Sequence, residues 1–125
     1  MEQTQHLPVP EDRALSVAWG TGPRRDTPAG SLADLIRASA LRHADRPALV
    51  CGSHRQSYAQ FAAAAELIAQ RLRHLGAGPG TTVAVCLARG PALPVALTGV
   101  LFAGAAYVPL DPTLPPARVR ELLRQ

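Results

Sequence analysis

The residues of this sequence that could do chemistry are few and scattered along the chain. A metal site needs several ligands brought together, and nucleophilic catalysis needs an activated side chain beside a base. The histidines are too far apart in sequence to predict a shared metal site: His6, His43, His54 and His74. Each is most simply a solvated or capping residue. No serine lies in a GxSxG elbow, so we predict no catalytic residue and no metal ligand in these 125 residues.

The two cysteines also lack a pattern for metal or redox chemistry. Cys51 and Cys86 are far apart, and each lies within an apolar run rather than in a CxxC motif. A thiol buried in apolar surroundings is usually inert. We therefore expect both cysteines to be free and buried.

A glycine-rich segment at residues 76–80, GAGPG, could let backbone amides approach a pyrophosphate. In a dinucleotide-binding loop, however, the glycines follow a strand and open a helix. Here they follow a helical pattern and precede TVAVCL at residues 82–87, an apolar run typical of a buried parallel strand. The order predicts a helix-to-strand turn and no cofactor-binding residue.

The net charge of +4 arises from 13 arginines and nine acidic residues, with no lysine. Nucleic-acid binding needs basic residues gathered on one face, usually with aromatic side chains beside them. The arginines are scattered, and aromatic residues make up 4% of the sequence. We find neither a signal-peptide pattern nor an apolar run long enough to span a membrane. We expect a cytoplasmic protein that binds neither nucleic acid nor membrane.

Proline and glycine recur so often in residues 1–30 that no long helix or strand can persist there. A short helix at residues 11–19 is the exception, with Leu15 and Trp19 on one side. We therefore expect a linker or leader at residues 1–30 and a domain at residues 31–125.

Two helices are marked at their starts by hydroxyl residues that can cap free backbone amides. Ser31 and Asp34 open a helix to about residue 43, while Ser57 and Gln60 open a longer one that Gly76 ends. The first apolar stripe should comprise Leu32, Leu35, Ile36 and Leu41. The second should comprise Phe61, Ala65, Ile68, Leu72 and Leu75.

Strands are expected between and after these helices. Residues 47–51 (PALVC) predict a buried strand, and residues 54–58 predict its return after a turn. Later, residues 82–87, a nearly all-apolar helix at residues 91–103 and a strand at residues 106–110 form a βαβ unit. Such a unit implies a parallel sheet and an α/β fold. A last helix should begin near Arg118 and continue to Gln125.

The segment LFAGAAYVPLDP at residues 101–112 closely resembles the second core motif of adenylation domains in nonribosomal peptide synthetases. QSYAQF at residues 56–61 resembles a loosened form of the first core motif. DRALSVAWGTG at residues 12–22 resembles the linker that joins a condensation domain to an adenylation domain. The likeness covers almost the whole chain.

Three positions depart from the family pattern. Phe102 stands where the family usually has lysine, Phe61 replaces the usual leucine, and Gly20 follows Trp19 where asparagine is common. Acyl-CoA ligases, aryl-acid ligases and luciferases share the architecture of these adenylation domains, but the sequence GAAYVPLDP at residues 104–112 favours the peptide-synthetase branch.

The resemblance implies the amino-terminal part of the large subdomain of an adenylate-forming enzyme, an ATP-dependent ligase that activates an amino acid as its acyl-adenylate and transfers it to a carrier-protein thiol. ATP and Mg²⁺ are expected for the complete enzyme, whose phosphate loop and catalytic lysine would lie beyond Gln125. We therefore expect no activity from this segment alone. Its expected partners are the rest of the adenylation domain and a carrier protein. Whether a condensation domain is a further partner stays open.

Two other functions remain open: a freestanding non-catalytic remnant or interaction module, and the amino-terminal part of an acyl- or aryl-acid CoA ligase. Within the second motif, scaffolding is the favoured role, with Asp111 accepting hydrogen bonds from nearby amides. A role of Asp111 in ligand binding is kept as the less favoured alternative, because ligands usually bind at the carboxyl ends of parallel strands. Tyr58 and Tyr107 are expected in the core.

Overall fold

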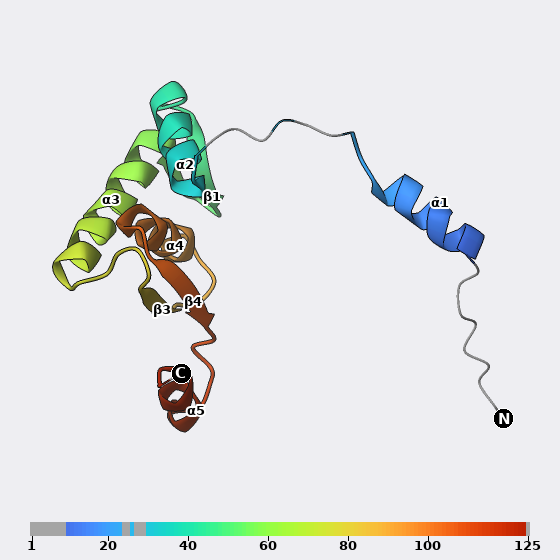
Figure 1. Ribbon diagram of the computed structural model, residues 1–125. Helices are drawn as coiled ribbons and strands as arrows, with labels where there is room; N and C mark the ends of the chain where they lie inside the picture. Colours follow the sequence, from blue (N-terminus) through green and yellow to red (C-terminus); the bar gives the residue numbers. More distant parts are fainter. Residues whose placement is uncertain (1–9, 24–25, 27–29, 125) are drawn as a thin grey trace.

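The computed structural model describes residues 10–23, 26 and 30–124. The elements follow the predicted order: α1 (Pro10–Gly20), α2 (Leu32–Arg42), β1 (Pro47–Cys51), β2 (His54–Ser57), α3 (Tyr58–His74), β3 (Thr82–Cys86), α4 (Ala92–Ala103), β4 (Ala106–Leu110) and α5 (Pro116–Leu122). Figure 1 shows α1 apart from the remaining elements, while α2, α3, α4 and the strands pack together. The result is the predicted α/β fold.

No helix in the described ranges is both long and apolar enough to cross a membrane.

Both predicted helix caps are confirmed. The Ser31 Oγ accepts a hydrogen bond from the amide of Asp34, whose carboxylate accepts one from the Ser31 amide at 2.9 Å. At the start of α3, the amide of Gln60 donates to the Ser57 Oγ, and the Ser57 amide donates to the Gln60 Oε1 at 3.0 Å. Each pair therefore satisfies two amides that the helix itself leaves without acceptors.

The antiparallel hairpin β1–β2 joins α2 to α3. The return strand ends one residue earlier than predicted, because Tyr58 already begins α3. The amide of Tyr58 donates to the carbonyl of Arg46, and that of Ala59 donates to the carbonyl of Ala44. These two bonds fasten the start of α3 to the turn that follows α2.

Strands β3 and β4 are parallel, with Thr82 opposite Ala106 and Cys86 opposite Leu110. Helix α4 connects them, so the predicted βαβ unit is confirmed. The glycine-rich residues 76–80 lie between α3 and β3, as the helix-to-strand interpretation requires. Gly76 has a φ of 89°, a left-handed conformation that glycine adopts without strain and that ends α3.

The contact between α3 and α4 forms the centre of the structure, and small residues allow it to be close. Ala65 and Ala69 of α3 are fully buried, and Val95 and Phe102 of α4 pack in the same cluster. A Cβ atom added at Gly99 of α4 would lie 2.6 Å from the Ile68 Cγ2, well inside van der Waals contact. The two helices could not approach so closely with a larger residue at that point.

The predicted apolar stripe of α2 is only partly right. Leu41 is 85% exposed and Leu32 is also exposed, whereas Ala33 and Ala40 are buried. The helix packs through its alanines because small side chains permit close approach to α3 and α4, which leaves the leucines at its flanks. Hydrophobicity alone selected the larger residues, of which Ile36 packs against the core whereas Leu32 and Leu41 are exposed.

Four further burial predictions are wrong. Both cysteines are free but exposed, and β1 is not buried. Leu75, predicted on the apolar stripe of α3, is 69% exposed, and Tyr107 is 39% exposed, while Tyr58 is half-buried. In the described residues each sheet has two strands. Helices α3 and α4 cover one face of β3, so Val85 is buried, but Cys86 projects from the other face.

We predict that Gly99→Ala destabilises the fold by about 1 to 3 kcal/mol, because the new methyl group must displace Ile68. Chemical denaturation of the two proteins measures the difference. Gly90→Ala is the matched control, since a Cβ atom there meets nothing within 4 Å. Equal stability of wild type and Gly99→Ala would contradict the close contact between α3 and α4.

Candidate functional site

The strongest candidate for a ligand-facing surface lies at the carboxyl ends of β3 and β4. A crevice of about 440 Å³ opens there between the segment after β3 and the segment after β4. Arg89 and Leu93 line one side, and Leu110, Asp111 and Thr113 line the other. Parallel sheets bind ligands at this end of their strands, so the position of Asp111 agrees with the ligand-binding role that the sequence analysis left open.

The contacts of Asp111 are those of a turn. Its Oδ1 accepts hydrogen bonds from the amide of Thr113 at 2.8 Å and from the Thr113 hydroxyl at 2.7 Å. The hydrogen bond from the Thr113 amide lowers the pKa of the Asp111 carboxyl most strongly, and the bond from the Thr113 hydroxyl lowers it further. The positive charge of Arg89 acts in the same direction. The predicted bonding to nearby amides is confirmed, and the carboxylate is exposed.

The preceding residues of the motif serve packing. Ala103 and Ala105 are buried on either side of Gly104, which ends α4 with a φ of 85°. A Cβ atom at Gly104 would lie 3.3 Å from the Cδ of Pro79, so the glycine also allows a close approach to the turn before β3. The motif thus sets the position of β4, and with it the crevice.

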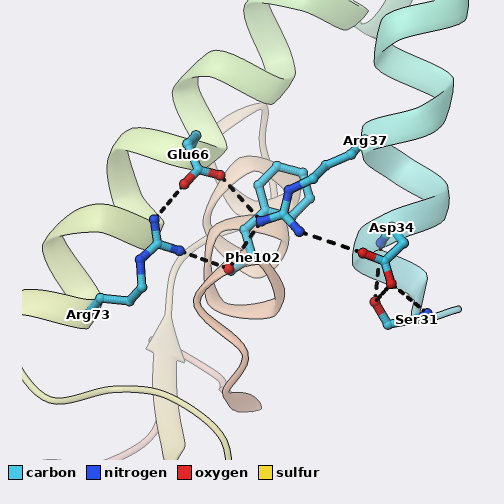
Figure 2. Close-up of polar contacts among 6 residues, drawn as sticks. All are labelled: Ser31, Asp34, Arg37, Glu66, Arg73 and Phe102. Atoms are coloured by element: carbon cyan, nitrogen blue, oxygen red, sulfur yellow. Dashed lines mark hydrogen bonds and ion pairs between the residues drawn. The ribbon is translucent and has the colours of Figure 1, made fainter.

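A polar cluster fixes the carboxyl end of α4. Arg37 of α2 and Arg73 of α3 both donate to the carbonyl oxygen of Phe102, at 3.2 and 3.0 Å. Glu66 of α3 accepts from both arginines, with the shorter contact to Arg73. Figure 2 shows these side chains converging from three helices, and we call the four residues the arginine clamp.

The clamp also explains the phenylalanine at position 102. Phe102 is 5% exposed, and the Arg37 guanidinium lies over its ring, with the guanidinium carbon 4.1 Å from the ring centroid. A lysine here would bring a second positive charge next to Arg37. Sequence reasoning missed the clamp, although Glu66 and Arg73 lie seven residues apart on one helix face and could have suggested a pair.

The charge on Glu66 is favoured by its partners. The hydrogen bond from Arg73 lowers the pKa of Glu66 most strongly, burial opposes this, and Arg37 adds a further lowering. The side chain of Glu66 is about one third exposed, so solvent weakens these interactions. The clamp is therefore a structural contact that holds the end of α4 against α2 and α3.

The remaining candidate residues do not converge. His43 caps α2 and lies against Tyr58, and the His74 Nδ1 is 2.8 Å from the carbonyl oxygen of Gln70 within α3. His54 is exposed on β2, and His6 lies outside the described residues. In the described part of the chain, no three His, Cys, Asp or Glu side chains are placed to hold a metal ion.

Comparison with known proteins identifies the class. Residues 36–125 match the family described as AMP-binding enzyme, and the chain belongs to that family. It corresponds to the amino-terminal part of the adenylation domain of a nonribosomal peptide synthetase. The division at residues 30 and 31 stays a prediction.

Individual relatives support this placement. The chain is 39% identical over 117 residues to the AMB antimetabolite synthetase AmbB of Pseudomonas aeruginosa, covering 94% of this chain and 9% of AmbB. It is 42% identical over 93 residues to the L-proline--[L-prolyl-carrier protein] ligase of Streptomyces coelicolor, covering 74% of this chain and 17% of the ligase. The segment thus spans a small part of the relatives it matches.

Solved structures agree. The nonribosomal peptide synthetase FmoA3, in its alpha-methyl-L-serine-AMP bound form, superposes with a TM-score of 0.79 at 34% identity, covering 92% of this chain and 13% of FmoA3. The N-terminal subdomain of Klebsiella oxytoca NpsA superposes with a TM-score of 0.69 over 75% of this chain and 24% of its own; its 24% identity supports the fold alone.

We predict that the clamp makes stability depend on pH through Glu66. Because the pKa of Glu66 is lowered from its ordinary 4.5, its charge stabilises the fold above that pH, and the contribution disappears as the pH falls through the folded-state pKa. The difference in unfolding free energy between wild type and Glu66→Gln should therefore shrink on acidification. Denaturant titrations at several pH values measure it.

Glu121→Gln provides the control, because Glu121 pairs with Arg118 in a contact whose side chains are both more than half exposed. Such surface pairs contribute little to stability. A wild-type advantage over Glu66→Gln that does not change with pH would contradict the role given to the Glu66 charge.

Proposed function

We propose that this segment is the amino-terminal scaffold of an adenylation domain. The complete enzyme would activate an amino acid with ATP as an acyl-adenylate and pass the acyl group to the thiol of a carrier protein. One observation carries the proposal: the superposition, at 34% identity, on a synthetase whose structure is described as bound to alpha-methyl-L-serine-AMP, an aminoacyl-adenylate. The buried residues of the second motif and the arginine clamp support a scaffolding role, because their contacts hold α4 and β4 in position.

ATP and Mg²⁺ belong to this proposal as cofactors of the complete enzyme. The described residues do not fit them: no group of metal ligands gathers, and Arg37 and Arg73 are already bound to Glu66 and to the carbonyl of Phe102. We therefore assign triphosphate and metal binding to the rest of the adenylation domain. The segment alone should catalyse no adenylation.

The carrier protein is supported as a partner by the NpsA-ThdA structure, an artificially fused adenylation–PCP di-domain from Klebsiella oxytoca. A condensation domain is a further proposed partner, which would contact α1. Trp19 is 81% exposed there, and Leu15 is exposed one turn before it. We place the complete enzyme in the cytoplasm.

A chimera tests the proposal. The matching segment of the Streptomyces coelicolor L-proline ligase is replaced by the corresponding residues of this chain, and proline-dependent exchange of pyrophosphate into ATP is measured. If the segment is a scaffold without catalytic or specificity residues, exchange should stay within about tenfold of the parent, or about 1.4 kcal/mol in activation free energy. Proline should remain the preferred amino acid.

The unmodified ligase and the 125-residue chain alone are the controls, and the isolated chain should show no exchange. A chimera that folds cooperatively but fails to activate proline would favour a non-catalytic module. A chimera that prefers another substrate would place specificity within this segment.

Asp111 can be tested in the same chimera by a matched pair of substitutions. Asparagine keeps the Oδ1 that accepts from Thr113, whereas alanine removes it. We expect Asp111→Asn to retain both thermal stability and exchange activity, and Asp111→Ala to lower the melting temperature. Loss of activity in Asp111→Asn at unchanged stability would show that the carboxylate charge itself serves a ligand.

A further inference from the structure

A second groove, with a volume of about 400 Å³, is lined by residues of α2, β1, α3 and α4. Its apolar walls are formed by Leu32, Leu35, Ile36, Ala48 and Phe61. No charged side chain of the described residues lines it. Small-molecule sites are concave, mostly apolar and of this size, with a few polar groups that fix the orientation of the ligand. The polar groups of the groove therefore decide whether it can serve as a site.

Three hydroxyl groups, each from a different helix, line this groove. They belong to Ser39 of α2, Tyr58 at the start of α3 and Thr98 of α4. Within the described part of the chain, none of these three hydroxyl groups makes a hydrogen bond. A hydroxyl can donate one hydrogen bond and accept two, so capacity of both kinds is unused here. Three separate helices thus bring unpaired polar groups to one groove.

Thr98 is the most informative of the three, because it is only 6% exposed. A threonine inside a helix commonly donates to a carbonyl oxygen three or four residues before it, but in the described structure Thr98 makes no such bond. No fully covered side-chain oxygen or nitrogen of the described residues lacks a partner, so the Thr98 hydroxyl must be reached from the groove. A buried hydroxyl without a hydrogen bond costs free energy, which a bound ligand would recover.

The lining residues also define the chemistry of the ligand. Since no charged residue of the described ranges lines the groove, an ion would lose its hydration there without gaining a counter-charge. Phe61 and Tyr58 are aromatic, which favours a ligand ring in stacked or edge-to-face contact. The hydroxyl groups favour a ligand that can both donate and accept a hydrogen bond. A neutral phenol meets all three conditions.

We propose that this groove binds a neutral phenolic small molecule, whose ring packs among the apolar side chains and whose hydroxyl bonds to Thr98. The inference goes beyond the proposed adenylation function and does not depend on it. The amino acid and ATP of that reaction do not suit the groove, because their charges would find no counter-charge among the described lining residues.

Two probes of matched shape test the proposal: p-cresol and p-xylene, which differ only in that a hydroxyl replaces a methyl group. Each is titrated into the 125-residue chain, and its dissociation constant is measured from amide chemical shifts. We expect p-cresol to bind at least about tenfold more tightly, because only p-cresol can bond to the groove hydroxyls. The largest shift changes should fall at Ser39, Phe61 and Thr98. Equal affinities, no binding, or shift changes that map elsewhere would overturn the proposal.

Thr98→Val tests the assigned hydrogen bond, because valine replaces the hydroxyl by a methyl group of similar size. It should weaken p-cresol binding about tenfold and leave p-xylene binding unchanged. Thr82→Val is the matched control, since Thr82 is exposed on β3 and does not line the groove. An unchanged affinity of Thr98→Val for p-cresol would contradict the assignment. The comparison of the two probes on the unmodified chain decides the question whatever the stability of the variant.

The same titration of the chimera shows whether the groove stays open in an assembled adenylation domain. We expect p-cresol to bind the chimera with the affinity that it has for the 125-residue chain. Binding to the isolated chain alone would show that other residues of the domain fill the groove, and would overturn the proposal. The titration uses neither ATP nor an amino acid, so its result is independent of whether the chimera activates proline.

Discussion

The close packing of α3 against α4 is the contact on which the other elements depend. Gly99 allows the helices to meet at Ile68 and Ala65, and the arginine clamp fastens the end of α4 to α2 and α3. Since α4 leads directly into β4 through Gly104, the position of the parallel strands follows from this contact. The crevice at their carboxyl ends is a consequence of the same packing.

Much of this arrangement could be predicted from the sequence because its signals are local. Ser31 and Ser57 cap helices through residues three positions away, and Gly104 ends α4 through its own backbone conformation. The order of strand, helix and strand determined the parallel pairing of β3 and β4. Asp111 was placed correctly because its turn involves a residue only two positions further on.

The incorrect predictions concern contacts between distant residues. Which side of α2 is buried depends on how closely α3 and α4 approach, so Ala33 and Ala40 were missed in favour of Leu41. Arg37 donates to the carbonyl oxygen of Phe102, which lies 65 positions later in the sequence, and no local pattern predicts that contact. Cys86 was expected to be buried because an apolar strand usually is, but only one face of β3 is covered by the described residues.

The central claim is that these residues form the amino-terminal part of an adenylation domain, with the chemistry supplied by residues that follow. Sequencing the DNA immediately downstream of the codon for Gln125 tests it most directly. The account predicts an open reading frame that encodes a phosphate-binding loop rich in serine, threonine and glycine. A stop codon at that position would contradict it and would make the protein a non-catalytic module.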